Sequence, residues 1–191
     1  MTTLKDWIRQ EGEVISPEYL RVDGFLNHRI APAFVEEAGR ELANAFKETG
    51  VTCVLTAEAA GNVVAYEIAR KLNTRALYAK KGRAATMAHP LVRAVRSPTK
   101  GTVTELAISR DYLGPHERVL IVDDFLYQGL TSTALAEMVE ESGACLVGFG
   151  FLIEKQFGNA RKVLARFGVP VVSLVTVAQM DPASTNIMFA D

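Results

Sequence analysis

Two adjacent carboxylates, followed by a loop with Gly and Thr, form the part of the chain best suited to chemistry. Asp123 and Asp124 follow four consecutive apolar residues, and segment 127–131 leads from them into a helix expected to begin near Ser132. Adjacent carboxylates repel each other and need water, a metal or hydroxyl donors, and a ribose offers two neighbouring hydroxyls. Backbone N–H groups and the dipole at a helix N-terminus favour a phosphate. The pattern predicts a ribose 5-phosphate site; a solvated acidic turn with a helix cap is the alternative.

The elements that would position this site alternate between strands and helices. Four apolar residues in a row are typical of a strand buried on both faces of a parallel sheet, and such sheets bind ligands beyond the carboxyl ends of their strands. The order of elements predicts an α/β fold, and 191 residues suit one domain over 1–191. The expected strands are 51–56, 76–79, 102–108, 119–122, 145–153 and 169–175, and the expected helices are 4–11, 32–49, 63–72, 132–142 and 160–167.

Segment 80–100 interrupts this alternation. It is rich in small and basic residues and contains Gly82, Pro90 and Pro98. A segment of this length without a clear apolar period is typical of a functional lid or a projecting hairpin, and a plain surface excursion is the alternative.

Composition and charge exclude several classes of protein. Hydrophobic residues make up 49% and charged residues 23%, as in soluble globular proteins. A net charge of -1 provides no basic field, so we expect neither a nucleic-acid nor a membrane partner. No signal-peptide pattern or transmembrane stretch is present, which predicts a cytoplasmic protein. Cys53 and Cys145 lie in apolar stretches and are expected to be buried and inert, and the three histidines lack metal-ligand spacing.

The stretch 119–133 resembles the phosphoribosyl pyrophosphate (PRPP) motif of type I phosphoribosyltransferases. Segments 20–28 and 153–157 resemble the bacterial xanthine phosphoribosyltransferases, and the likeness runs from about Leu4 to about Val175. It implies the type I phosphoribosyltransferase fold, which is a mainly parallel central sheet flanked by helices. It also implies a small N-terminal hood over about 1–30 and a flexible lid loop over about 82–102.

The resemblance implies a PRPP site built from two loops and two lysines. Small residues at 59–61 would let backbone amides approach the pyrophosphate closely, and segment 127–131 would hold the 5-phosphate. Ammonium groups would stabilise the departing pyrophosphate, although lysines at a strand end are commonly just solvated. The implied PRPP ligands are Ala59, Ala60, Gly61, Lys81, Lys100, Tyr127, Gln128, Gly129, Leu130 and Thr131.

Three of these positions depart from the family pattern. Gln128 is larger than the residue found there in many relatives, and Ala59 and Ala60 stand where hydroxyl residues are frequent. Backbone binding of phosphate should survive these changes, but two side-chain donors would be missing.

Three residues are implied to form the purine site: Leu20, Asn27 and Lys155. The first two match the hood of the xanthine phosphoribosyltransferases. An Asn amide could donate to the C2 carbonyl that distinguishes xanthine from hypoxanthine, although an isolated Asn before a helix is more often a cap. Lys155 follows the strand expected to end at Ile153 and would face the 6-oxo group, where a cation disfavours the amine of adenine.

The implied reaction displaces pyrophosphate from C1 of PRPP by a ring nitrogen of xanthine, which gives xanthosine 5′-monophosphate in purine salvage. Its transition state should have oxocarbenium character. Asp123 and Asp124 are assigned to the ribose hydroxyls as catalytic residues, and one of them could assist proton movement on the purine. Mg²⁺ is the implied cofactor, with no protein ligand directly assigned. The resemblance also implies a homodimer.

Two alternatives remain open. The same enzyme class could use guanine, hypoxanthine or adenine instead of xanthine. A non-catalytic, PRPP-sensing purine regulator would resemble this chain in the Asp-Asp loop, but such regulators carry an additional N-terminal DNA-binding domain. Few residues precede Leu20 and the chain is not basic, so we expect the enzyme.

Overall fold

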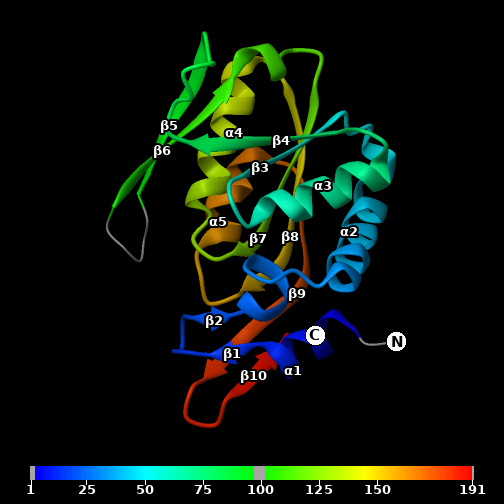
Figure 1. Ribbon diagram of the computed structural model, residues 1–191, viewed down its shortest axis with the longest axis vertical. Helices are drawn as coiled ribbons and strands as arrows, with labels where there is room; N and C mark the ends of the chain where they lie inside the picture. The colour runs from blue at the N-terminus through cyan, green and yellow to red at the C-terminus, as the bar shows by residue number, and fades with distance from the viewer. Residues whose placement is uncertain (1–2, 97–101, 191) are drawn as a thin grey trace.

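The computed structural model describes residues 3–96 and 102–190 (Figure 1). Its centre is an eight-stranded sheet with the order β10-β9-β8-β7-β3-β4-β6-β5. Neighbouring strands from β9 to β4 run parallel, while β10, β6 and β5 are antiparallel to the strands they pair with. The strands are β3 (Cys53–Ala57), β4 (Arg75–Lys81), β5 (Pro90–Arg96), β6 (Val103–Ser109), β7 (Arg118–Leu126), β8 (Cys145–Lys155), β9 (Val171–Asp181) and β10 (Asn186–Phe189).

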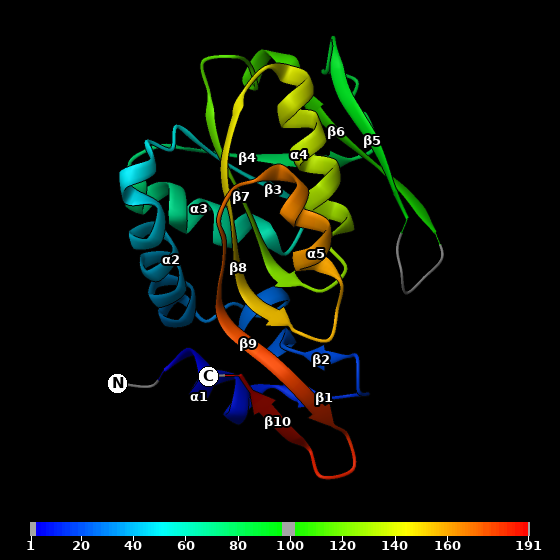
Figure 2. The same cartoon turned by 180° about the vertical axis from the view of Figure 1, so that it is seen from behind.

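Helices cover both faces of the sheet. α2 (Pro32–Phe46) and α3 (Gly61–Leu72) pack on one face, and α4 (Leu130–Ser142) and α5 (Ala160–Leu164) pack on the other, which faces the viewer in Figure 2. The apolar run of β7 shows why both faces are covered. Leu120 and Val122 belong to the α2–α3 core, Val119 and Ile121 belong to the α4–α5 core, and all four are fully buried. The predicted α/β class and mainly parallel sheet are confirmed.

Several predicted boundaries are wrong by a few residues. β7 continues through Asp123 and Asp124 to Leu126, because its hydrogen-bonded pairing with β8 extends beyond the apolar run. α4 begins at Leu130 rather than near Ser132, and β8 ends at Lys155 rather than at Ile153. Pairing between strands, which no local pattern reports, decides where these strands end.

Segment 80–100 contains β5, the first strand of a projecting antiparallel pair whose second strand, β6, follows the segment. β5 pairs with β6 in an unbroken antiparallel register from Pro90 opposite Ser109 to Arg96 opposite Val103. We call these two strands the arm, which extends from one edge of the sheet (Figure 1). Of the expected lid over 82–102, residues 97–101 lie outside the described residues.

The hood contains α1 (Leu4–Glu11), β1 (Glu13–Val14), β2 (Leu20–Arg21) and a single π-helical turn, Asp23–Asn27. An aromatic cluster of Trp7, Phe25 and Phe34 joins the hood to α2. The ring centroids are 6.1 Å apart for Trp7 and Phe25, 6.0 Å apart for Trp7 and Phe34, and 4.9 Å apart for Phe25 and Phe34. β10, which was not predicted, supports the hood from the other end of the chain. The Lys5 Nζ donates to the Ala190 carbonyl oxygen at 3.2 Å, and the Arg9 guanidinium lies 4.8 Å from the Phe189 ring centroid.

The two cysteines differ in exposure. Cys53 is buried as predicted, and its burial raises the pKa of its thiol to about 12. Cys145 is exposed, so the prediction that it is buried was wrong. It is the first residue of β8 and lies beyond the helices that cover the rest of that strand. None of the described helices is long and apolar enough to span a membrane.

Candidate active site

The carboxyl ends of β3, β4 and β7 open onto a cleft of about 890 Å³. Hood residues, two loops at strand ends and the arm form its walls. The predicted site residues in its lining are Asn27, Ala59, Ala60, Lys81, Asp123, Asp124, Tyr127, Gln128, Gly129, Leu130 and Thr131. The sheet edge therefore gathers residues that are far apart in sequence, as the switch-point rule predicts.

Asp123 and Asp124 lie at the centre of this cleft in unequal environments. The Asp123 Oδ1 accepts a hydrogen bond from the Asp124 backbone N–H at 3.0 Å, and the Asp124 Oδ1 accepts one from the Phe125 N–H at 2.9 Å. Burial, followed by repulsion from Asp124, raises the pKa of the Asp123 carboxyl well above its usual range, although the Lys81 ammonium opposes this shift. One carboxyl of the pair therefore binds a proton more tightly than an ordinary aspartate does.

The phosphate loop, residues 127–131, leads from β7 into α4. Gly129 has φ +74° and caps the helix in a left-handed conformation, which a residue without a side chain adopts freely. The Thr133 N–H donates to the Gly129 carbonyl oxygen at 2.9 Å, so the earlier amides of the helix are left without intrahelical partners. The loop and the α4 N-terminus face the cleft and can bind a phosphate.

A second anion loop, residues 58–61, joins β3 to α3. Ala59 and Ala60 line the cleft, while Gly61 is buried behind them. A Cβ on Gly61 would overlap the Thr56 Oγ1 and lie 2.9 Å from the Asp123 Oδ1. Glycine at this position therefore lets the second loop pack directly against the carboxylate pair.

Sequence analysis missed Glu58 as a site residue. Its carboxylate accepts a hydrogen bond from the Lys81 backbone N–H at 2.6 Å, which joins the second loop to the end of β4. Glu58 directly follows a buried strand, so the same rule that singled out Asp123 could have found it. Four arm residues in the lining, Val95, Arg96, Thr104 and Leu106, were also missed, as were Thr102, which precedes β6, and the hood residues Asp23 and His28.

Lys81 and Lys80 point to different places. Lys81 lines the cleft, while Lys80 lines a separate cavity that also contains Tyr78 and Tyr112. Lys100 lies outside the described residues.

Two of the predicted purine residues lie outside the cleft lining. Leu20 is buried in the hood core. The Lys155 Nζ donates to the Glu18 carbonyl oxygen at 2.6 Å and lies 4.9 Å and 5.4 Å from the ring centroids of Phe125 and Tyr127. These two rings line the cleft and so separate Lys155 from it. Burial lowers the pKa of the Lys155 ammonium.

The third predicted purine residue, Asn27, does reach the carboxylates, with its Nδ2 3.4 Å from the Asp124 Oδ2.

Comparison with known proteins identifies the family. A profile described as the phosphoribosyl transferase domain matches residues 28–181. The chain belongs to the phosphoribosyltransferase family. Xanthine phosphoribosyltransferases of Deinococcus deserti and Heliobacterium modesticaldum are 41% and 40% identical to it, and the alignments cover 100% of this chain and 99% and 100% of theirs.

Solved structures agree with this family assignment at the level of fold. The adenine phosphoribosyltransferase of Giardia lamblia, complexed with 9-deazaadenine, gives a TM-score of 0.79 at 18% identity and covers 92% of this chain and 98% of its own. That of Rhodothermus marinus gives 0.76 at 22% identity and covers 93% of this chain and 100% of its own. The predicted phosphoribosyltransferase fold is confirmed.

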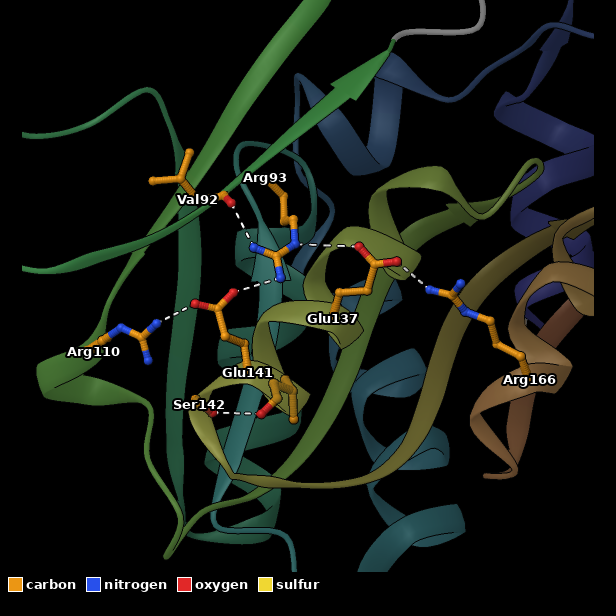
Figure 3. Close-up of polar contacts among 8 residues, drawn as sticks. Val92, Arg93, Arg110, Glu137, Glu141, Ser142 and Arg166 are labelled. Atoms are coloured by element: carbon orange, nitrogen blue, oxygen red, sulfur yellow. Dashed lines mark hydrogen bonds and ion pairs between the residues drawn. The ribbon is translucent and has the colours of Figure 1, made fainter.

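The arm of this phosphoribosyltransferase is tied to α4 by a chain of alternating charges (Figure 3). The Arg93 guanidinium lies between two carboxylates of α4, 2.7 Å from Glu141 and 3.5 Å from Glu137. Arg110 pairs with the carboxylate oxygen of Glu141 that Arg93 does not contact, which is Oε1. Arg166 pairs in the same way with the Oε1 of Glu137. The network therefore joins the arm to the C-terminal half of α4.

Replacing Arg93 with Ala is expected to lower the free energy of unfolding by about 1 kcal/mol, because two partly exposed ion pairs are lost together. Urea unfolding of the variant and of the unchanged protein measures the difference. Arg83→Ala is the matched control, since among the described residues Arg83 forms an ion pair with Glu105 alone, and both side chains are mostly exposed. Equal stability of the two variants would show that the network adds nothing to a single surface pair.

Proposed function

We propose that this phosphoribosyltransferase transfers the 5-phosphoribosyl group from PRPP to xanthine, with xanthosine 5′-monophosphate and pyrophosphate as products. The observation that carries the proposal is identity of about 40% over the whole chain with relatives named xanthine phosphoribosyltransferase, including the hood and the end of β8. The cleft supports it, because a carboxylate pair lies between two loops that can each bind an anion.

PRPP would lie along this carboxylate pair. The 5-phosphate is assigned to the phosphate loop and the α4 N-terminus, and the pyrophosphate to Ala59, Ala60, Gly61 and Lys81. The ribose hydroxyls would donate to Asp123 and Asp124. Lys81 is thereby placed to neutralise charge that develops on the leaving pyrophosphate.

The chain's own groups would work by positioning and by proton transfer. The protein would hold the sugar and the base in position and would need no covalent nucleophile of its own, since a purine nitrogen attacks the oxocarbenium-like sugar directly. Asp123, with its raised pKa, is the group best suited to take the proton that the purine releases.

Mg²⁺ is proposed as the cofactor, and the donor chemistry fits a metal carried in with PRPP. Among residues 3–96 and 102–190, no three His, Cys, Asp or Glu side chains converge as a metal site. Asp123 and Asp124 offer hard oxygen donors, and PRPP oxygens would complete the ligand set. When bound, the ion would supply positive charge to the leaving pyrophosphate.

The purine is assigned to the side of the cleft where the hood meets β8. Asn27 would donate to the C2 carbonyl, Phe125 would contact the purine face, and Lys155 would approach the 6-oxo group. Lys155 must then leave the Glu18 carbonyl that it contacts in the described structure.

We further propose that the protein is a homodimer in the cytoplasm. Sedimentation of the purified protein tests the oligomeric state.

Nucleotide formation from PRPP and Mg²⁺ with each of four bases tests the function. We expect xanthosine 5′-monophosphate to form at the highest kcat/KM. Preference for guanine, hypoxanthine or adenine would preserve the reaction and overturn the purine assignment. DNA binding at physiological salt without turnover of any base would instead favour a PRPP-sensing regulator.

A further inference from the structure

We infer that the turn after β8, residues 156–160, sets the position of the phosphate loop and that Gly158 is the residue that allows the two segments to touch. This inference rests on the proposed function of the phosphate loop. It adds a positioning role for a turn whose own residues are not part of the cleft lining.

Three contacts join the turn to the loop. The Ala160 N–H donates to the Tyr127 carbonyl oxygen at 3.2 Å. The Phe157 ring packs edge-on against the Tyr127 ring, with centroids 5.7 Å apart. A Cβ on Gly129 would lie 3.2 Å from the Ala160 Cα, so the helix-capping glycine of the phosphate loop already lies against the turn. Each contact involves a residue of the loop that precedes α4.

Gly158 lies at the closest approach. A Cβ there would overlap the Tyr127 carbonyl oxygen and would lie 2.7 Å from the Tyr127 Cδ2 and 2.8 Å from the Tyr127 carbonyl carbon. Gly158 does not have a positive φ, so the glycine is required by proximity and not by its own backbone conformation. Because two of the three atoms are backbone, an added methyl group must move the phosphate loop or the turn.

The turn is the less free of the two to move, because an ion pair closes it. The Arg161 Nε and Nη2 each lie 2.7 Å from an oxygen of Glu154, and the Arg161 Nη1 donates to the Val171 carbonyl oxygen at 3.1 Å. Glu154 is buried, which opposes ionisation, yet the Arg161 hydrogen bonds hold the pKa of its carboxyl below its usual value. Both ends of the turn are thus fixed to β8 and β9, and the phosphate loop yields instead.

Gly158→Ala tests this inference. We expect both the KM and the Kd for PRPP to rise about tenfold, because a small displacement of the loop misaligns its amides, while the KM for xanthine changes less than about twofold. Gly114→Ala is the matched control, since its Cβ would make ordinary contacts of 3.5 Å and 3.6 Å with His116. Steady-state kinetics and calorimetric titration of PRPP with Mg²⁺ give the values. Unchanged PRPP binding in a folded Gly158→Ala protein, or equal rises for both substrates, would overturn the inference.

Arg161 provides a second test should Gly158→Ala fail to fold. Arg161→Ala should raise the Kd for PRPP, and Arg161→Lys should restore part of the loss, because a lysine keeps the charge without the two-pronged contact. Equal PRPP affinity in all three proteins would overturn the inference. PRPP binding by the unchanged protein distinguishes failure of the proposed function from failure of the inference. If the unchanged protein does not bind PRPP, both are overturned. If it binds PRPP and these substitutions leave the affinity unchanged, the inference alone is overturned.

Discussion

Asp123→Asn is expected to reduce kcat by at least about a hundredfold while leaving the protein folded and at least as stable at neutral pH. The amide keeps an oxygen that can accept the Asp124 N–H, but it cannot take up a proton from the purine and accepts ribose hydroxyls less strongly. Asp124→Asn should also lower turnover severely, since it weakens the other acceptor for the ribose hydroxyls. Product formation under saturating PRPP and xanthine measures both effects.

The stability part of this prediction follows from the raised pKa of Asp123. In the folded protein this carboxyl holds its proton more tightly than in the unfolded chain, where its pKa is near the ordinary value of 3.8. Stability contributed by Asp123 is therefore present below that value and is lost as pH rises toward the raised pKa. As pH rises above 3.8 this contribution falls, and the Asn variant, which does not titrate, is free of the loss. Thermal unfolding at acid and neutral pH should show the variant gaining on the unchanged protein as pH increases.

Asp181→Asn is a suitable contrast. Asp181 lies in the β9–β10 hairpin, where hydrogen bonds from Ser184 and Ala183 hold the pKa of its carboxyl below its usual value. Its replacement should leave activity unchanged and bring no gain in stability at neutral pH. Full activity of Asp123→Asn would remove the ribose-binding argument altogether.

Lys155→Ala is expected to raise the KM for xanthine about ten- to hundredfold, the range for loss of a hydrogen bond from a charged donor. The KM for PRPP should change far less, because Lys155 lies outside the lining that the phosphate loop provides. Lys162→Ala controls for loss of positive charge nearby, because the Lys162 side chain is exposed on α5. Equal increases for both substrates would assign Lys155 a structural role through its contacts with Glu18 and the aromatic rings.

The sequence predicts the core of this fold well because its signals there are local. The apolar run at 119–122 and the two aspartates that follow it determine both a buried strand and its ligand end. β10 escaped prediction because Asn186–Phe189 has only four residues and is stabilised by pairing with β9, which lies outside any local window. The exposure of Cys145 likewise depends on where the helices end above β8.

Site prediction succeeded and failed for the same reason. Asp123, Asp124 and the phosphate loop are contiguous, so their spacing identifies them. Glu58 acts through a bond to the Lys81 backbone, and Lys155 is held by Glu18, a residue 137 positions away. Such partners meet only when the chain has folded, and no single segment records them.

The contacts of the hood with residues 186–190 join segments that are very far apart in sequence. Lys5 and Ala190, whose side chain and carbonyl oxygen are hydrogen-bonded, are 185 positions apart, and Arg9 lies over the ring of Phe189. Closing so long a loop costs conformational entropy, and that cost falls once the strands between the two segments have paired. Packing of the hood, and with it the purine side of the cleft, is therefore expected to be a late step in folding.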